Sequence, residues 1–249
     1  RYSPRANFAS QMHEGYLGLG AFGTAGLFVD EARTRGMMYR AVHLADLYVM
    51  ENQHGMIDTV YRTIETRARN VEKMFPDGNI SPDTIKLAKE RPDTPVKLLH
   101  LVQPREDRDP ERRTRTNMPW FSGYFDVETK ELIEEGGFPS NPYIVSRYNT
   151  GPRETYGRSP AMTILPDIKM LNEMSKTVIR AGQKVVDPPL MIADEGVILP
   201  VDTNPGKATF VRMDGRNQAP IQPLFTGARV DIGLEMMDQR RKIINDAFL

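Results

Sequence analysis

Two segments near the end of the chain carry its clearest helical patterns. Residues 166–186 repeat apolar side chains at steps of three and four residues, and these are Ile168, Leu171, Met174, Val178, Ala181 and Val185. Such steps place side chains on one face of an α-helix. Pro166 opens or kinks this predicted helix, and Pro188 and Pro189 end it. Residues 231–249 predict a second helix, whose apolar side comprises Met236, Met237, Ile243, Ile244, Ala247 and Phe248.

The first 158 residues show mostly strand patterns interrupted by turns. The segments 37–42, 46–51 and 56–64 predict an antiparallel meander, and further strands are expected at 24–31, 96–103, 118–127, 131–137 and 142–149. Short helices are expected at 65–75 and directly after Ser81 and Pro82. A strand-and-turn insertion at 190–215 separates the two long helices. This order of elements predicts an α+β protein.

Composition narrows the class of protein. The 249 residues are 39% hydrophobic and 27% charged, which is typical of a folded chain of one large or two small domains. The 33 basic and 33 acidic residues balance, so any nucleic-acid contact must come from local placement of charge. Without cysteine, disulfides and Cys-ligated metals are excluded. We expect no membrane span or signal peptide, and we expect the chain to be part of a longer protein, because it starts at Arg1 and stops inside a helical pattern.

The segment GLGAFG, residues 18–23, matches the G-x-G-x-x-G pattern of dinucleotide-binding proteins. That chemistry needs a buried parallel strand before the glycines and a helix after them, so that helical N–H groups face the pyrophosphate. Here the residues before the glycines read as a helix and residues 24–31 read as a strand. The order is the reverse of the required one, so we expect the glycines to end a helix.

Other enzyme signatures are absent from the sequence. His13, His43, His54 and His100 show no metal-ligand spacing, and neither a P-loop nor a G-x-S-x-G motif occurs. We therefore predict no catalytic residues, no cofactor and no metal site.

Basic residues gather on the two long helices. Lys176, Arg180 and Lys184 follow at intervals of four, on one face and away from the apolar stripe, whereas Arg240, Arg241 and Lys242 are consecutive and fan around the second helix. Either these faces are simply solvated or a polyanion runs along them.

A longer segment favours the second of these interpretations, contact with a polyanion. Residues 147–192, RYNTGPRETYGRSPAMTILPDIKMLNEMSKTVIRAGQKVVDPPLMI, resemble the head-to-tail connecting, or portal, proteins of short-tailed phages. The marks are YGRSP, then LPDIKMLN, then a long helix that ends in DPP. IDTVYRTIETRARNVEKMF (57–75), LLHLVQPR (98–105), PYIVSRY (142–148) and DIGLEMMDQRRKIINDAF (231–248) follow the family pattern in order.

The resemblance implies a non-enzymatic ring, usually a dodecamer, at one capsid vertex, with double-stranded DNA passing through its channel. In that architecture residues 1–158 form a β-rich wing, 159–187 and 230–249 form two stem helices, and 188–229 form a small α/β clip between them. The family's N-terminal helical region, channel loop and crown would lie outside residues 1–249.

The same resemblance implies the partners and the site residues. The major capsid protein would surround the ring, and the clip would bind the terminase during packaging and the tail adaptor later. The protein would assemble in the host cytoplasm and end in the virion. Channel-facing residues would come from Lys176, Arg180, Lys184, Arg240, Arg241 and Lys242, and docking residues from Asp194, Glu195, Asp202, Lys207 and Arg212. Two alternatives stay open, a nucleotide- or dinucleotide-binding enzyme that uses Gly18–Gly23 and a small nucleic-acid-binding module.

Overall fold

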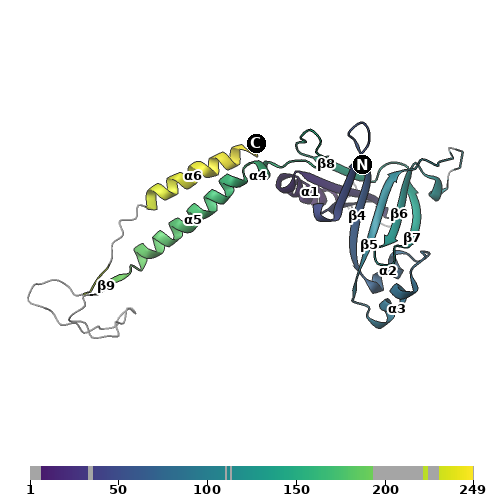
Figure 1. Ribbon diagram of the computed structural model, residues 1–249, viewed down its shortest axis with the longest axis horizontal. Helices are drawn as coiled ribbons and strands as arrows, with labels where there is room; N and C mark the ends of the chain where they lie inside the picture. Colours follow the sequence, from purple (N-terminus) through teal and green to yellow (C-terminus); the bar gives the residue numbers. More distant parts are fainter. Residues whose placement is uncertain are drawn as a thin grey trace, which may run out of the picture. The chain divides into compact units, whose positions relative to one another are not determined.

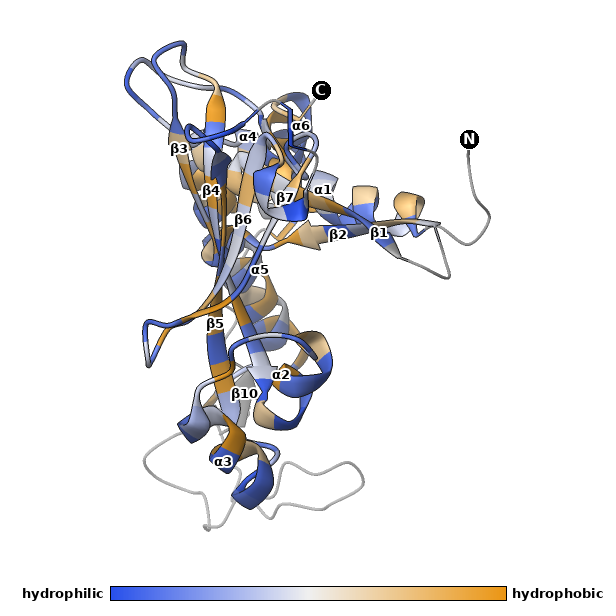
Figure 2. Cartoon of the chain, turned by 90° about the vertical axis from the view of Figure 1, so that its right-hand side faces the viewer, coloured by the Kyte–Doolittle hydropathy of each residue, from blue (hydrophilic) through white to orange (hydrophobic). Residues whose placement is uncertain are grey.

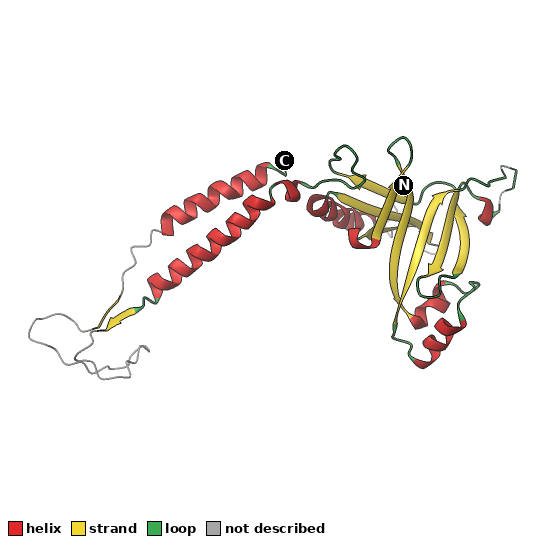
Figure 3. Ribbon diagram, in the orientation of Figure 1, coloured by secondary structure: helices red, strands yellow, loops and turns green. Residues whose placement is uncertain are grey.

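The computed structural model describes residues 7–32, 36–109, 111–112, 114–192, 221–223 and 230–248. The chain divides into two compact units, residues 1–163 and residues 164–249. The first holds most of the described strands, and the second holds the two longest described helices (Figures 1 and 3). The α+β class expected from the sequence is confirmed.

The larger sheet of the first unit has five antiparallel strands in chain order (Figure 3). They are β3 (Leu47–Glu51), β4 (Ile57–Arg67), β5 (Pro95–Pro104), β6 (Trp120–Asp126) and β7 (Leu132–Phe138). Along β5 every second residue is buried, namely Val96, Leu98, His100 and Val102, because alternate side chains of a strand point to opposite faces. Figure 2 shows hydrophobic stretches along these strands in orange.

A second sheet has three antiparallel strands in the order β2-β1-β8, which are β2 (Gly36–Val42), β1 (Thr24–Ala32) and β8 (Tyr143–Arg147). The prediction that residues 37–42 belong to the same meander as 46–51 and 56–64 was therefore wrong. A short 3₁₀ turn, η1 (Leu44–Asp46), separates β2 from β3 and leads the chain from one sheet to the other. The alternating pattern identified the strand, but it carries no information about its partner.

The hydrophobic core draws on both sheets. One buried cluster joins Phe28 and Tyr143 of the three-stranded sheet to Leu47, Val60 and Val102 of the five-stranded sheet. The rings of Phe28 and His100 meet edge to face, with centroids 5.7 Å apart. Helix α1 (Phe8–Phe22) lies against β1 and β2.

A second cluster packs two short helices against the larger sheet. These helices are α2 (Ala68–Met74) and α3 (Pro82–Glu90), and their cluster includes Val71, Phe75 and Leu98. The helix expected at 65–75 begins later, because β4 continues to Arg67. The predicted start of α3 is confirmed, since the Ser81 hydroxyl accepts a hydrogen bond from the Asp83 N–H at 3.3 Å.

The glycine segment at residues 18–23 joins a helix to a strand. Gly18 and Gly20 lie inside α1, which corrects the expectation that all the glycines end the helix. Gly23 alone ends it, with φ of 76° and its N–H bonded to the Leu19 carbonyl. A helix followed by a strand is the reverse of a dinucleotide site, and all the pairings among the described strands are antiparallel.

Gly23 also allows the YGRSP segment to pack closely against the end of α1. A Cβ added at Gly157 would lie 2.2 Å from the Gly23 carbonyl oxygen, so neither glycine tolerates a side chain. The Gly157 N–H donates to the Thr24 hydroxyl at 2.8 Å, and the Ser159 hydroxyl donates to the Ala21 carbonyl at 2.8 Å. Ser159 then precedes the one-turn helix α4 (Pro160–Thr163). The two motifs noted in the sequence thus pack against each other.

The second unit contains an antiparallel helical hairpin, formed by α5 (Leu165–Val186) and α6 (Val230–Asp246). Strands β9 (Leu190–Ile192) and β10 (Ile221–Pro223) pair between them in sequence. Most of the segment expected to form the clip lies outside the described residues. Among the described helices, none combines the length and apolar character that crossing a membrane requires.

Candidate functional site

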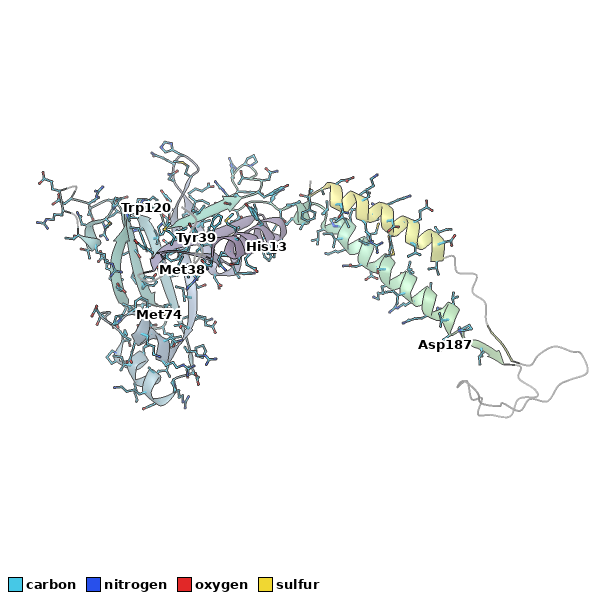
Figure 4. All side chains as sticks on the ribbon, turned by 180° about the vertical axis from the view of Figure 1, so that it is seen from behind. His13, Met38, Tyr39, Met74, Trp120 and Asp187 are labelled. Atoms are coloured by element: carbon cyan, nitrogen blue, oxygen red, sulfur yellow. The ribbon has the colours of Figure 1, made fainter. Side chains whose placement is uncertain are left out.

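Helix α5 begins and ends where the sequence places its prolines. Pro166 and Asp167 occupy its first turn, where a missing N–H costs nothing and a carboxylate complements the helix dipole. Its last residue is Val186, and Asp187 follows with a non-helical φ of −128° before Pro188 (Figure 4 labels Asp187). The predicted long helix is thus confirmed to within one residue at its start.

One face of α5 lies against α6. The positions predicted as its apolar stripe are partly buried, apart from the exposed Val185, and they include Ile168, Leu171, Met174, Val178 and Ala181. Val178 is in direct contact, because a Cβ built on Gly233 would lie 2.6 Å from its Cγ2. The helices therefore approach closely where α6 has no side chain.

The facing side of α6 differs from the predicted one. Its buried or partly buried positions follow steps of three and four, and they are Val230, Gly233, Met237, Arg240, Ile244 and Ala247. Met236, Ile243 and Phe248, which the sequence pattern assigned to the same apolar side, are about half exposed. The prediction from hydrophobicity was wrong because the side of α6 that contacts α5 includes Gly233, which permits close approach, and Arg240, which is charged.

Arg240 joins the two helices. Its Nη1 lies 2.8 Å from the Asp167 Oδ1 in an ion pair between the end of α6 and the first turn of α5. Together with the Val178–Gly233 contact this pair fixes the antiparallel register of the hairpin. The sequence analysis missed Asp167, and its place directly after Pro166 was the available signal.

The opposite face of α5 is basic. Lys169, Lys176, Arg180 and Lys184 are exposed and occupy the side of α5 turned away from α6. Lys176 makes an ion pair with Glu173 at 3.6 Å. We call these four residues the basic edge. The expectation that the α5 cations point away from the apolar stripe is confirmed, and whether they line a channel stays a prediction.

The remaining predicted site residues have different surroundings. Arg241 pairs with Asp238 of its own helix at 2.6 Å, and Lys242 is exposed on the side of α6 opposite α5, near Glu235 in the helical repeat. The five predicted docking residues lie outside the described residues, and they are Asp194, Glu195, Asp202, Lys207 and Arg212.

A buried polar network links the two sheets of the first unit. His100 shares hydrogen bonds with the Tyr143 hydroxyl at 2.7 Å and the Ser122 hydroxyl at 2.9 Å. Its ring stacks on Tyr124, with centroids 4.1 Å apart. Burial, and secondly the Arg62 cation, lower the pKa of His100 to about 3, and burial raises the pKa of Tyr124 to about 12. His100 is fully buried, so the geometry favours a neutral structural histidine over a proton carrier.

The other histidines have local roles or lie at the surface. His43 accepts a hydrogen bond from the Ala45 N–H at 3.1 Å, His54 is in the β3–β4 turn, and His13 is exposed on α1 (labelled in Figure 4). Within the described part of the chain, no three His, Cys, Asp or Glu side chains gather as a metal site would require.

Comparison with known proteins identifies the family. The family model for the bacteriophage head to tail connecting protein matches residues 4–249. The chain is 26% identical over 248 residues to a probable portal protein of Bordetella phage BPP-1, covering 96% of this chain and 44% of that protein. It is 23% identical over 249 residues to a portal protein of Salmonella phage epsilon15, covering 98% of this chain and 45% of that protein. The chain thus spans less than half the length of these curated relatives, and it belongs to the bacteriophage head-to-tail connecting protein family.

Proposed function

We propose that this chain forms the wing, stem and clip of a phage portal, a ring at one capsid vertex through which double-stranded DNA is packaged and ejected. The family match over residues 4–249 and two relatives named as portal proteins support this function. The wing comprises residues 1–158, the stem helices 159–187 and 230–249, and the clip 188–229. In this role the chain acts as a structural component of the virion and not as an enzyme.

The observation that carries the DNA part of the proposal is the basic edge of α5. Three of its members, Lys176, Arg180 and Lys184, are one turn apart and project from the side opposite α6. In a ring, each cation recurs in every copy and forms a charged collar. Attraction to phosphates without contacts to base edges would hold DNA laterally and still permit it to slide.

The hairpin presents the α5 edge, rather than the α6 edge, to the channel. Arg240 and Arg241 are held in close ion pairs with Asp167 and Asp238, at 2.8 and 2.6 Å. Lys176 of the α5 edge is held more loosely, with its Nζ 3.6 Å from Glu173. Lys242 shares its exposed face of α6 with acidic residues, including Glu235. Of the six cations predicted to face the channel, the three on α5 are therefore the stronger candidates.

The partners follow from this role. The ring holds twelve copies, the usual number in the family, and is enclosed by the major capsid protein. The clip binds the terminase during packaging and the tail adaptor afterwards, through residues that include Asp194, Glu195, Asp202, Lys207 and Arg212.

Ring formation is tested by imaging. The purified full chain, studied by mass photometry and negative-stain microscopy, should give closed rings with a central hole. Particles that stay monomeric or dimeric at micromolar concentration would favour the alternative of a small nucleic-acid-binding module.

The channel surface is tested by neutralising charge. Replacing Lys176, Arg180 and Lys184 with Gln should weaken binding of a double-stranded DNA of arbitrary sequence. The dependence of log K on log salt should fall by about 0.9 for each phosphate contact removed. The matched control, Arg241→Gln with Lys242→Gln, should leave both quantities unchanged. If only the control weakens binding, the hairpin faces the other way, and if neither does, the cations do not meet DNA.

The clip is tested by deletion. Replacing residues 193–220 with a short Gly-Ser linker should abolish DNA packaging in a reconstituted system and leave the fluorescence of the single tryptophan, Trp120 in the wing, unchanged. Packaging at the normal rate by the deletion variant would contradict the assignment.

A further inference from the structure

The helical hairpin leaves large apolar side chains uncovered on both helices. On α6, Ile232, Met236 and Ile243 are about half exposed and follow at steps of four and seven residues, which places them in one stripe. On α5, Met170 is also about half exposed. We call these four residues flank A.

A second group is exposed elsewhere on the same hairpin. Leu165, Ile179 and Val186 of α5 are separated by two and one heptads and therefore share one stripe, with Ile179 58% and Val186 86% exposed. Leu234 and Phe248 of α6 are about half exposed as well. We call these five residues flank B.

The two flanks lie on opposite sides of the hairpin. The helices run antiparallel and face each other through Asp167–Arg240 and Val178–Gly233, which fixes the rotation of each. At about 100° per residue, flank A falls on one side of that contact on both helices, and flank B falls on the other side on both helices.

Charged edges separate the flanks. The basic edge of α5 runs along one border of the hairpin. The side of α6 turned away from α5 carries Glu235, Asp238 and Asp246 beside Lys242, so its charge is mainly acidic. The hairpin thus has two apolar sides, flank A and flank B, and two charged edges that separate them.

We infer that flank A of one copy packs on flank B of the next copy of this chain. The inference rests on the proposed ring and adds which surfaces close it. Because the two flanks differ in their residues and lie on opposite sides, the contact is heterologous, and repeated contacts of that kind generate a ring when the rotation closes. A membrane surface or a single bound peptide would cover one side and leave the other exposed.

This packing also determines which sides of the hairpin remain accessible in the ring. With both flanks buried against neighbours, the α5 edge and the α6 edge are the sides that stay accessible. One of them therefore faces the lumen and the other the exterior, in line with the cation placement proposed above.

Two complementary variants of the full chain test the inference. Variant A carries Met236→Glu and Ile243→Glu, and variant B carries Ile179→Glu and Leu234→Glu. Each introduces carboxylates at exposed positions, so far-UV circular dichroism should show unchanged helix content. Alone, each should lose the ring in mass photometry and remain monomeric. A control, Glu235→Gln on the acidic edge, should assemble as the unsubstituted chain does.

Mixing the two variants gives the decisive result. Variant A retains flank B and variant B retains flank A, so one intact junction can form between them. The mixture should give one-to-one dimers and no larger species. Rings formed by either variant alone, or homodimers of one variant, would overturn the flank pairing while leaving the ring function in place. A monomeric unsubstituted chain would instead contradict the proposed function, and this inference with it.

Discussion

The first unit (residues 1–163), which contains the proposed wing and takes that name below, buries its apolar residues differently from the helical hairpin. In the described part of the chain, all the buried hydrophobic residues except Ile164 and Met237 belong to residues 1–163. The hairpin instead leaves ten large apolar side chains of α5, α6 and Phe248 exposed, namely the nine of the two flanks defined above and Val185. The wing therefore has a core of its own, whereas the hairpin exposes many large apolar side chains, as surfaces that bind another protein often do.

The difference indicates that stability and assembly reside in separate parts of the molecule. Damage to the wing should lower the free energy of unfolding of a single chain. Damage to the hairpin flanks should act on association between chains. Trp120, the single tryptophan, lies on β6 of the wing (Figure 4), so its fluorescence reports wing unfolding alone.

The largest effect is expected in the wing core. Leu98→Ala removes a fully buried side chain of the cluster beneath α2, and should lower the free energy of wing unfolding by about 2–5 kcal/mol. Urea unfolding followed by Trp120 fluorescence measures it. Leu234→Ala, at a half-exposed flank position, should leave that urea midpoint unchanged and weaken ring assembly. The reverse result would contradict the division of roles.

A smaller effect is expected where YGRSP meets the end of α1. Gly157→Ala places a methyl group against the Gly23 carbonyl and should cost about 1–3 kcal/mol of wing stability. Gly182→Ala in α5 is the matched control, because its added Cβ meets nothing within 4 Å. That control should stabilise the helix by about 0.5–1 kcal/mol, measured as slower amide hydrogen exchange in α5. Equal destabilisation by both would show that the close approach of the two glycines is not needed.

The buried histidine makes wing stability depend on pH. An unfolded histidine binds a proton below about pH 6.5, while the pKa of folded His100 is about 3. Between these two pH values the unfolded chain binds the proton and the folded chain does not. The free energy of unfolding therefore decreases as the pH falls from 6.5 toward 3, by up to about 1.4 kcal/mol per pH unit, and His100 causes no such loss above pH 6.5.

The substitution His100→Gln should remove this part of the acid dependence, measured as the slope of unfolding free energy between pH 6 and pH 4. His54→Gln, in the exposed β3–β4 turn, should leave the slope unchanged. An unaltered slope in the His100 variant would mean that this histidine is protonated in the folded wing.

The smallest effect concerns the ion pair within the hairpin. Asp167 and Arg240 are partly exposed, so a double-mutant cycle with Asp167→Asn and Arg240→Gln should give a coupling of about 0.5–1 kcal/mol. Hydrogen exchange in α6 measures it, and high salt should reduce it. Asp238 and Arg241, paired within α6 alone, should couple by no more than about 0.5 kcal/mol. A coupling at Asp238–Arg241 as large as that at Asp167–Arg240 would argue against a special role for the interhelical pair.

Local patterns alone identified most of the elements. The stripe from Ile168 to Ala181 predicted α5, the prolines predicted its ends, and Ser81 predicted the start of α3, because these signals depend on neighbours a few residues away. These local signals could not predict which strands pair when the partners are distant in the sequence. Nothing local to residues 37–42 reveals that they pair with β1 rather than with β3.

The candidate site divides in the same way. The sequence by itself determined that Lys176, Arg180 and Lys184 share one face of a helix, since helical spacing fixes that relation. Only the tertiary structure decided which side of α6 meets α5, because Gly233 and Arg240 enter that contact through close approach and an ion pair, and hydrophobicity signals neither. The exposed apolar flanks could likewise be identified only from the packing of α5 on α6, because burial depends on the packed pair and not on either helix alone.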